Sequence, residues 1–310
     1  PTRRSSDLVA LGGGSSLDTA KIACALAANP GSLEEYQWEG RKFENEPLPL
    51  CALPTTSGTG SEVTGVSVIT SRNTKKGVLG DAMYPKLTLI DAELTLSLPP
   101  RITAHTGMDT LTHAVEAFLG RGASPVSDGF ARESIRLTGK NLPVVFKNGD
   151  NLEARHEMSL ASSMAGIAFD QSGLGIVHSL AGPVCADLHI PHGLAMAFLL
   201  PFGLEYNREV SAGRIAEIGK LLGAVKDGES TEKAVEKTIA YVRELRDELD
   251  LQPDFDDIVA KFREHKRSSG IDEADFGKRA SQMFLMKNNP VLPSAEECAG
   301  LFGRIFAGGE

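Results

Sequence analysis

Residues 107–116 of this 310-residue chain read GMDTLTHAVE. Asp109 and His113 are four residues apart, so on a helix their side chains lie on one face, one turn from each other. A carboxylate and an imidazole on one face are half of a divalent-metal site. The spacing alone leaves open the alternative that both are hydrogen-bonded core residues.

Two further histidines lie in the segments HSLAGP, at 178–183, and IPHG, at 190–193. His178 and His192 could complete a metal site, but a single helix would separate them by about 21 Å, at about 1.5 Å per residue. The chain must therefore reverse direction between them. Gly182, Pro183 and Pro191 are suitable helix breakers.

These stretches together closely resemble the iron-containing, or group III, alcohol dehydrogenases, and the resemblance covers nearly the whole chain after Leu8. It implies a truncated, Rossmann-like α/β nucleotide-binding domain followed by an all-α domain, in a dehydroquinate synthase-like architecture. It also implies that Fe(2+), or alternatively Zn(2+), is bound by Asp109, His113, His178 and His192.

The implied activity is that of an NAD(P)-linked alcohol dehydrogenase or aldehyde reductase. Hydride would pass between an alcohol carbon and the nicotinamide, and the metal would polarise the substrate oxygen. The resemblance implies a small alcohol or aldehyde as substrate and a homodimer as a frequent form, and it leaves NAD or NADP open. Many relatives carry a second histidine four residues after the one matching His178, where this chain has Gly182, so a proton relay through that position is in doubt. His189 and a water chain are the candidate substitutes, and His189 is the candidate catalytic residue.

A glycine-rich segment, GGGSSLDTAK at 12–21, follows a strand-like run and precedes a helix-like one, 18–28. Glycines allow close backbone approach, and a helix N-terminus offers free N–H groups, a combination that favours phosphate. The alternative is a tight turn with Ser16 or Asp18 as helix cap. The resemblance implies contact with the cofactor pyrophosphate, and the candidate residues are Gly13, Gly14, Ser15, Ser16 and Asp18.

A threonine-rich segment, PTTSGTGSEVT at 54–64, follows an apolar strand at 48–53, where α/β folds place ligands. Its hydroxyls can donate to ribose or phosphate oxygens, although such loops are usually only solvated. The resemblance implies contact with the nicotinamide half of the cofactor through Thr55, Thr56, Thr59 and Ser61. It places Lys76 at the ribose, on the return strand of a hairpin that turns at 71–74. The charged stretch 36–46 is interpreted as a surface excursion.

From residue 103 the periodicity becomes helical, and 98–100 (Leu-Pro-Pro) marks a boundary between a domain at 1–100 and a helical metal-binding domain at 101–310. His156 and His265 lie in polar stretches and are predicted at the surface, and His105 shares the face of Asp109. The predicted helices are 103–119, 127–146, 151–169, 175–183, 194–206, 212–222, 231–249, 255–266, 273–286 and 295–306.

Composition is that of a globular protein, with 41% apolar and 24% charged residues. A net charge of −9 argues against nucleic acid or an anionic membrane as partner. The four cysteines are widely spaced and no apolar run approaches a membrane span, so we expect a cytoplasmic protein with reduced thiols.

A dinucleotide fold normally has an earlier strand–helix unit carrying the acidic residue that binds the ribose. We therefore expect a fragment without its first portion, and residues 1–8 (PTRRSSDL) can be interpreted as an assembly artefact or as a genuine disordered tail. Two alternatives to the main interpretation stay open: a zinc polyol dehydrogenase of the glycerol type and a non-catalytic fragment of such an enzyme. A third, a metal-free reductase, is disfavoured by the set of one aspartate and three histidines.

Overall fold

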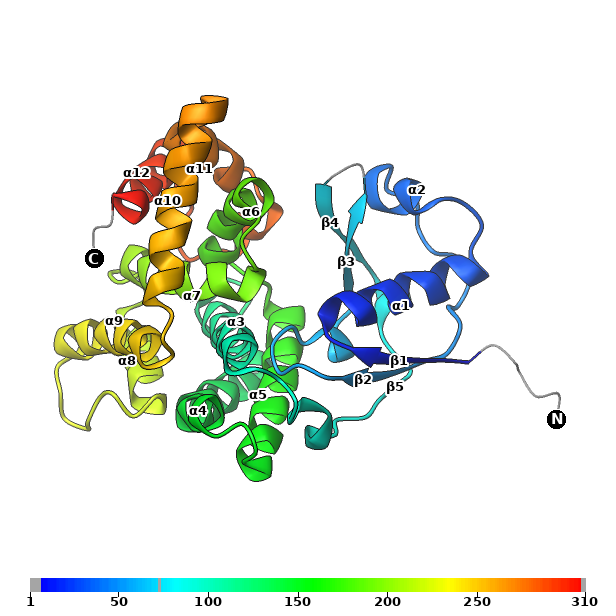
Figure 1. Cartoon of the computed structure of the whole chain (residues 1–310), viewed down its shortest axis with the longest axis horizontal. Coiled ribbons are helices and arrows are strands. Elements are labelled where there is room, and N and C mark those ends of the chain that lie inside the picture. Colours follow the sequence, from blue (N-terminus) through cyan, green and yellow to red (C-terminus); the bar gives the residue numbers. More distant parts are fainter. Residues whose placement is uncertain (1–6, 72–73, 308–310) are drawn as a thin grey trace.

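The computed structural model describes residues 7–71 and 74–307, which form an α/β lobe and a helical lobe (Figure 1). The α/β lobe contains a parallel sheet in the order β1–β2–β5, formed by β1 (Leu8–Gly12), β2 (Leu50–Pro54) and β5 (Leu87–Thr88). Gly12 is in register with Pro54, so the carboxyl ends of β1 and β2 lie side by side. This register brings the glycine-rich and threonine-rich segments to one edge of the sheet.

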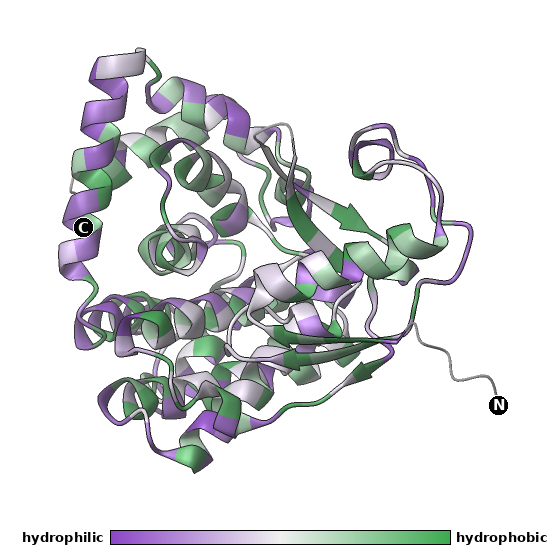
Figure 2. Ribbon diagram, turned by 45° about the vertical axis from the view of Figure 1, so that its right-hand side comes forward, coloured by the Kyte–Doolittle hydropathy of each residue, from purple (hydrophilic) through white to green (hydrophobic). Residues whose placement is uncertain are grey.

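Helix α1 (Gly14–Ala28) covers one face of this sheet. Its apolar side chains Leu17 and Cys24 pack with Ala10, Leu50 and Ala52 in a small core. The opposite face of β1 is open: Val9 is 67% and Leu11 is 58% exposed. In Figure 2 the strands are largely hydrophobic, whereas the outermost helix, α10 (Gln252–Ser269), is largely hydrophilic.

The predicted hairpin is confirmed as β3 (Val66–Ser71) paired with β4 (Thr74–Leu79), and part of its turn, residues 72–73, lies outside the described residues. The interpretation of 36–46 as a surface excursion is wrong at its start. Tyr36 is buried in the short helix α2 (Leu33–Trp38) and its ring stacks on Phe43 at 4.2 Å. Below 12 residues a helix has little periodicity to detect, which is why the pattern missed it.

The helical lobe is organised around α3 (Pro100–Leu119), whose residues from Gly107 to Leu119 are all buried. Helices α4, α5 and α7 pack around it. The other helices of the described chain are α4 (Pro125–Lys147), α5 (Leu152–Ser172), α6 (Ile176–Leu188), α7 (His192–Tyr206), α8 (Ala212–Leu221), α9 (Thr231–Glu248), α10, α11 (Glu273–Ser281) and α12 (Ala295–Phe306).

The helix predictions hold for type and approximate position, with two corrections. Helix α6 does not break at Gly182 and Pro183 but continues to Leu188, because its packing against α7 and α11 outweighs the lost hydrogen bond at proline. The predicted helix 273–286 ends at Ser281, and a separate 3₁₀ turn follows at Phe284–Asn288. No helix of the described residues is long and apolar enough to cross a membrane.

Candidate metal centre

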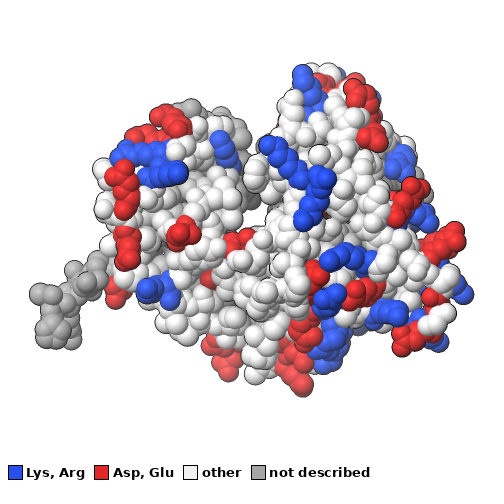
Figure 3. Space-filling model, turned by 180° about the vertical axis from the view of Figure 1, so that it is seen from behind, with Lys and Arg blue, Asp and Glu red and all other residues white. Residues whose placement is uncertain are grey.

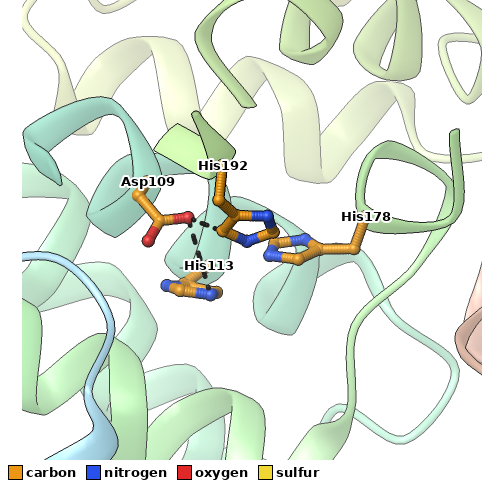
Figure 4. Close-up of side chains that lie close together, drawn as sticks. All are labelled: Asp109, His113, His178 and His192. Carbon is orange, nitrogen blue, oxygen red and sulfur yellow. Dashed lines mark ion pairs between the residues drawn. The ribbon is translucent and has the colours of Figure 1, made fainter. Parts of the chain in front are cut away.

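The four predicted ligands converge on one point although they come from three helices (Figure 4). Asp109 and His113 lie one turn apart on α3, His178 lies in the first turns of α6, and His192 is the first residue of α7. Each offers one ligand atom, and these atoms all lie within 4.8 Å of one another. One carboxylate and three imidazoles at this spacing match the ligand types that bind a divalent metal ion.

The carboxylate of Asp109 lies close to two of the three histidines. Its Oδ1 lies 3.5 Å from His192 Nε2 and 3.8 Å from His113 Nε2. The rings of His113 and His178 are stacked with centroids 4.8 Å apart, and those of His178 and His192 are 5.3 Å apart. Three ligands are therefore aimed at the same small volume beside one carboxylate oxygen.

The ring of His113 is held in place by contacts with Gly58 and Phe169. Its Nδ1 lies 3.1 Å from the carbonyl oxygen of Gly58, which accepts the ring N–H, and its face packs on Phe169. Burial, helped by His178 and His192, holds the pKa of His113 well below its usual value. The imidazole is thus neutral, with Nε2 left as a lone-pair donor.

The ring of His178 is fixed by Glu116, whose Oε2 lies 2.6 Å from its Nδ1. The other ring nitrogen, Nε2, is buried and has no hydrogen-bond partner among the described residues. A buried polar atom without a partner is costly unless something else binds it. This orphaned nitrogen, facing the carboxylate and two other imidazoles, shows that the residues present fit a divalent metal ion.

Of the four residues of the centre, three are buried and His192 is partly exposed. The side chains of Asp109, His113 and His178 are 4–6% exposed, whereas that of His192 is 40% exposed. Figure 3 shows a cleft between the two lobes. A small molecule could therefore approach the centre past His192.

The chain reversal between His178 and His192 lies further along than Gly182. Helix α6 ends at Leu188, its C-cap His189 has φ 52° and ψ 40°, and Ile190 and Pro191 lead into α7. His189 is exposed and is not part of the four-residue cluster. Its predicted catalytic role stays a prediction.

Seven of the ten predicted cofactor residues lie together where β1 and β2 end. The amide of Thr55 donates to Gly12 O, and a Cβ added to Gly14 would lie 2.7 Å from a side-chain carbon of Thr59. The two loops therefore touch, and they present accessible backbone and hydroxyl groups at the N-terminus of α1. These seven residues are Gly13, Gly14, Ser15, Ser16, Thr55, Thr56 and Thr59.

Two other predicted cofactor residues bind each other instead of facing solvent. Ser61 Oγ donates to Asp18 Oδ1 at 2.6 Å, and the amide of Val68 donates to Asp18 Oδ2. Both side chains are buried, and Asp18 thereby joins α1 to the 3₁₀ turn Ser61–Val63 and to β3. Contact of Asp18 and Ser61 with the cofactor stays a prediction. Lys76 lies on β4 with its ammonium 4.2 Å from the centroid of the Trp38 ring.

The threonine-rich loop also reaches the metal centre. Besides the Gly58–His113 bond, the carbonyl of Ser57 accepts a hydrogen bond from Thr110 on α3 at 3.1 Å. A Cβ on Gly58 would lie 2.8 Å from Thr106, so only glycine allows this approach. Segments predicted to hold the cofactor and the metal are therefore directly joined.

Sequence reasoning missed Glu116, although it stands in the opening stretch. It lies three residues after His113 and seven after Asp109, so helical spacing puts all three on one face, and that signal was available. The predictions for the remaining histidines are mixed. His156 is exposed as predicted, His105 is buried, and the side chain of His265 is only 22% exposed, 3.4 Å from Asp187.

Comparison with known proteins agrees with this geometry. Residues 4–92 match the family described as iron-containing alcohol dehydrogenase, and residues 103–305 match the C-terminal part of the Fe-containing alcohol dehydrogenase family. The boundary predicted at residue 100 falls between the two matches and stays a prediction.

Individual relatives support the same assignment. The chain is 41% identical to long-chain-alcohol dehydrogenase 1 of Geobacillus thermodenitrificans over 77% of its own length and 62% of the relative's. It is 36% identical to sulfoacetaldehyde reductase of Bilophila wadsworthia, with 96% and 76% covered. The solved alcohol dehydrogenase from Oenococcus oeni superposes with a TM-score of 0.89 at 31% identity, over 97% of this chain and 76% of that one. With both family matches and the shared fold in agreement, this chain belongs to the iron-containing alcohol dehydrogenase family.

Proposed function

We propose that this chain is a metal-dependent, NAD(P)-linked alcohol dehydrogenase that works equally as an aldehyde reductase. The observation that carries the proposal is the convergence of Asp109, His113, His178 and His192 beside the loop that follows β2. Family membership supports it. The reaction takes two electrons and one proton from the alcohol carbon as hydride and releases the hydroxyl proton, giving an aldehyde and the reduced cofactor.

The protein's own part is to hold and orient. Asp109, His113, His178 and His192 would hold the metal, while the loops at Gly13–Ser16 and Thr55–Thr59 would hold the cofactor. When bound, the metal supplies a Lewis acid for the substrate oxygen, and the nicotinamide accepts or donates the hydride. The hydrogen bond that His113 donates to Gly58 O joins these two sites, and such positioning is a large part of catalysis.

The metal is proposed to be Fe(2+), as the descriptions of both family matches suggest. Imidazole and carboxylate ligands also suit Zn(2+), and metal availability often decides between them. The substrate is proposed to be a small or medium aliphatic alcohol or aldehyde. Relatives are named for a long-chain alcohol, for sulfoacetaldehyde and for 1,3-propanediol, so the family framework accepts varied chains.

Anaerobic reconstitution tests this proposal. The metal-free chain is loaded with Fe(2+) or Zn(2+), and NAD(P)H absorbance is followed with a panel of linear alcohols and diols. Asp109→Asn keeps the size of the side chain but removes its charge, and Ser134→Ala, which removes a buried hydrogen bond between α4 and α5, is the control. We expect turnover with iron in wild type and the control only. Turnover that is independent of added metal would refute the proposal, and preference for zinc and polyols would favour the glycerol-type alternative.

A further inference from the structure

Glu116 contacts the metal centre indirectly, and both of its carboxylate oxygens are occupied by protein donors. Oε2 accepts from Nδ1 of His178 at 2.6 Å, and Oε1 accepts from the backbone N–H of Val177, also at 2.6 Å. The side chain is 5% exposed. One buried carboxylate therefore binds both the ring of His178 and the backbone N–H of the residue before it.

The first contact sets the position of the imidazole proton. A carboxylate only accepts hydrogen bonds, so the proton of a neutral His178 ring must sit on Nδ1. This leaves the lone pair on Nε2, the nitrogen that is buried without a hydrogen-bond partner among the described residues. The tautomer enforced by Glu116 is thus the one able to bind a cation at the centre.

The second contact fixes the start of α6. Gly175 is the N-cap of this helix, so the N–H groups of Ile176 and Val177 have no partner within the helix. Asn289 Oδ1 accepts from Ile176 at 3.3 Å, and Glu116 accepts from Val177. A negative charge beside these N–H groups is also favoured by the helix dipole.

Gly175 allows these hydrogen bonds at the start of α6 because it has no side chain. A Cβ there would lie 3.0 Å from Asn289 Oδ1 and 3.2 Å from Glu116 Oε1. Such contacts would push both acceptors away from the helix end. The glycine at the start of α6 therefore leaves room for the Glu116 carboxylate from α3.

We propose that Glu116 is the positioning residue of the metal centre: it selects the Nδ1–H tautomer of His178 and fixes the first turn of α6 so that Nε2 points at the ion. Asp109, His113 and Glu116 then form one unit on the rigid, fully buried part of α3. Two members bind the ion, and the third aims a ligand from another helix. The inference rests on the proposed metal site.

Glu116→Gln tests this role with almost no change of shape. The amide oxygen of glutamine can accept from either the His178 ring or the backbone N–H of Val177, but not from both. The amide NH₂ would then face the remaining N–H, and two donors cannot form a hydrogen bond. If the ring turns its acceptor to that NH₂, the proton moves to Nε2 and blocks the metal-binding position. We expect metal affinity, measured by chelator competition, to fall about 10–100-fold.

The tautomer can be observed without metal or activity. Nitrogen-15 NMR of the metal-free chain distinguishes Nδ1–H from Nε2–H imidazoles, and His178→Gln identifies its signal among the seven histidines. We expect the Nδ1–H form in wild type and its loss in Glu116→Gln. This measurement on wild type tests the inference even where the variant folds poorly.

Ser134→Ala separates positioning from general destabilisation. It deletes a buried bond of Ser134 to Ala161 O between α4 and α5 and should lower the unfolding midpoint without changing metal affinity or the His178 tautomer. Equal metal affinity in Glu116→Gln and wild type, or an Nε2–H tautomer in wild type, would overturn the inference. A wild-type chain that binds no metal would instead overturn the proposed function on which it rests.

Discussion

His189 and His192, three residues apart, occupy opposite ends of one chain reversal. His189 ends α6 in the left-handed conformation and is exposed, whereas His192 begins α7 and brings its Nε2 to 3.5 Å from Asp109 Oδ1. The backbone conformation at 189 thus determines where the ligand at 192 lies. Any catalytic role of the His189 ring must be separated from this structural one.

Replacing His189 by asparagine makes this separation. Asparagine tolerates the left-handed region well, so the turn and the unfolding midpoint should be preserved. A proton relay through the imidazole predicts that turnover at neutral pH falls about tenfold or more, with unchanged metal content. Steady-state kinetics and thermal melts check this. Unchanged turnover would show that His189 has only a structural role in the turn.

Removing a histidine ligand should abolish metal retention and turnover together. His178→Ala should also lower stability by about 1–3 kcal/mol, because it leaves the buried Glu116 carboxylate without its ring donor. His192→Ala, at a half-exposed position, should lose the metal with a smaller change in stability. Elemental analysis and melts of the metal-free proteins measure both effects, and full metal content in either variant would contradict the ligand set.

Gly14→Ala should weaken cofactor binding. The new methyl would lie 2.7 Å from Thr59 Cγ2 and would push apart the two loops at the ends of β1 and β2. Overpacking costs about 1–3 kcal/mol, and a cost of this size borne by the bound state corresponds to about 5- to 150-fold in the dissociation constant. NADH fluorescence titration measures it. Gly129→Ala, with no neighbouring atom within 4 Å, is the matched control and should bind cofactor normally.

Lys21 should make the free energy of unfolding depend on pH in the alkaline range. It is buried, it donates to Thr64 O and Val66 O, and burial lowers its pKa from 10.5 to about 8 despite the nearby Asp18 and Glu62. Between these values the unfolded chain binds more protons than the folded one, so stability rises with pH. At about 1.4 kcal/mol per pKa unit, this contribution reaches about 3 kcal/mol.

The variant Lys21→Met has no proton to lose at this position. Urea unfolding at several pH values from 7.5 upward should therefore show wild type gaining stability relative to the variant as pH approaches about 10.5. Other lysines and tyrosines titrate in both proteins and cancel in the comparison. Parallel curves for the two proteins would contradict the assignment.

The sequence predicted what depends on local spacing and short motifs. Asp109 and His113 could be placed on one helical face, and a strand before each of the glycine- and threonine-rich loops followed from apolar runs ending in turn residues. The break at Gly182 and Pro183 was predicted wrongly because local helix propensity yields to packing of α6 on α7 and α11. Asp18 and Ser61, both predicted cofactor residues, bind each other across 43 positions, a contact that no local pattern shows. Glu116 was overlooked since its function depends on His178, 62 residues later.

The hydrogen bond from His113 to Gly58 would make the two proposed binding sites thermodynamically dependent on each other. An ion that immobilises the His113 ring also immobilises the peptide of Gly58, and with it the hydroxyl-bearing loop that would meet the nicotinamide. The ligand that binds first would lose affinity to the conformational entropy of ordering this region, and the second would not. Each ligand would then raise the affinity of the other by the same factor. Cofactor titrations on protein stripped by a chelator would therefore understate the affinity of the metal-loaded enzyme.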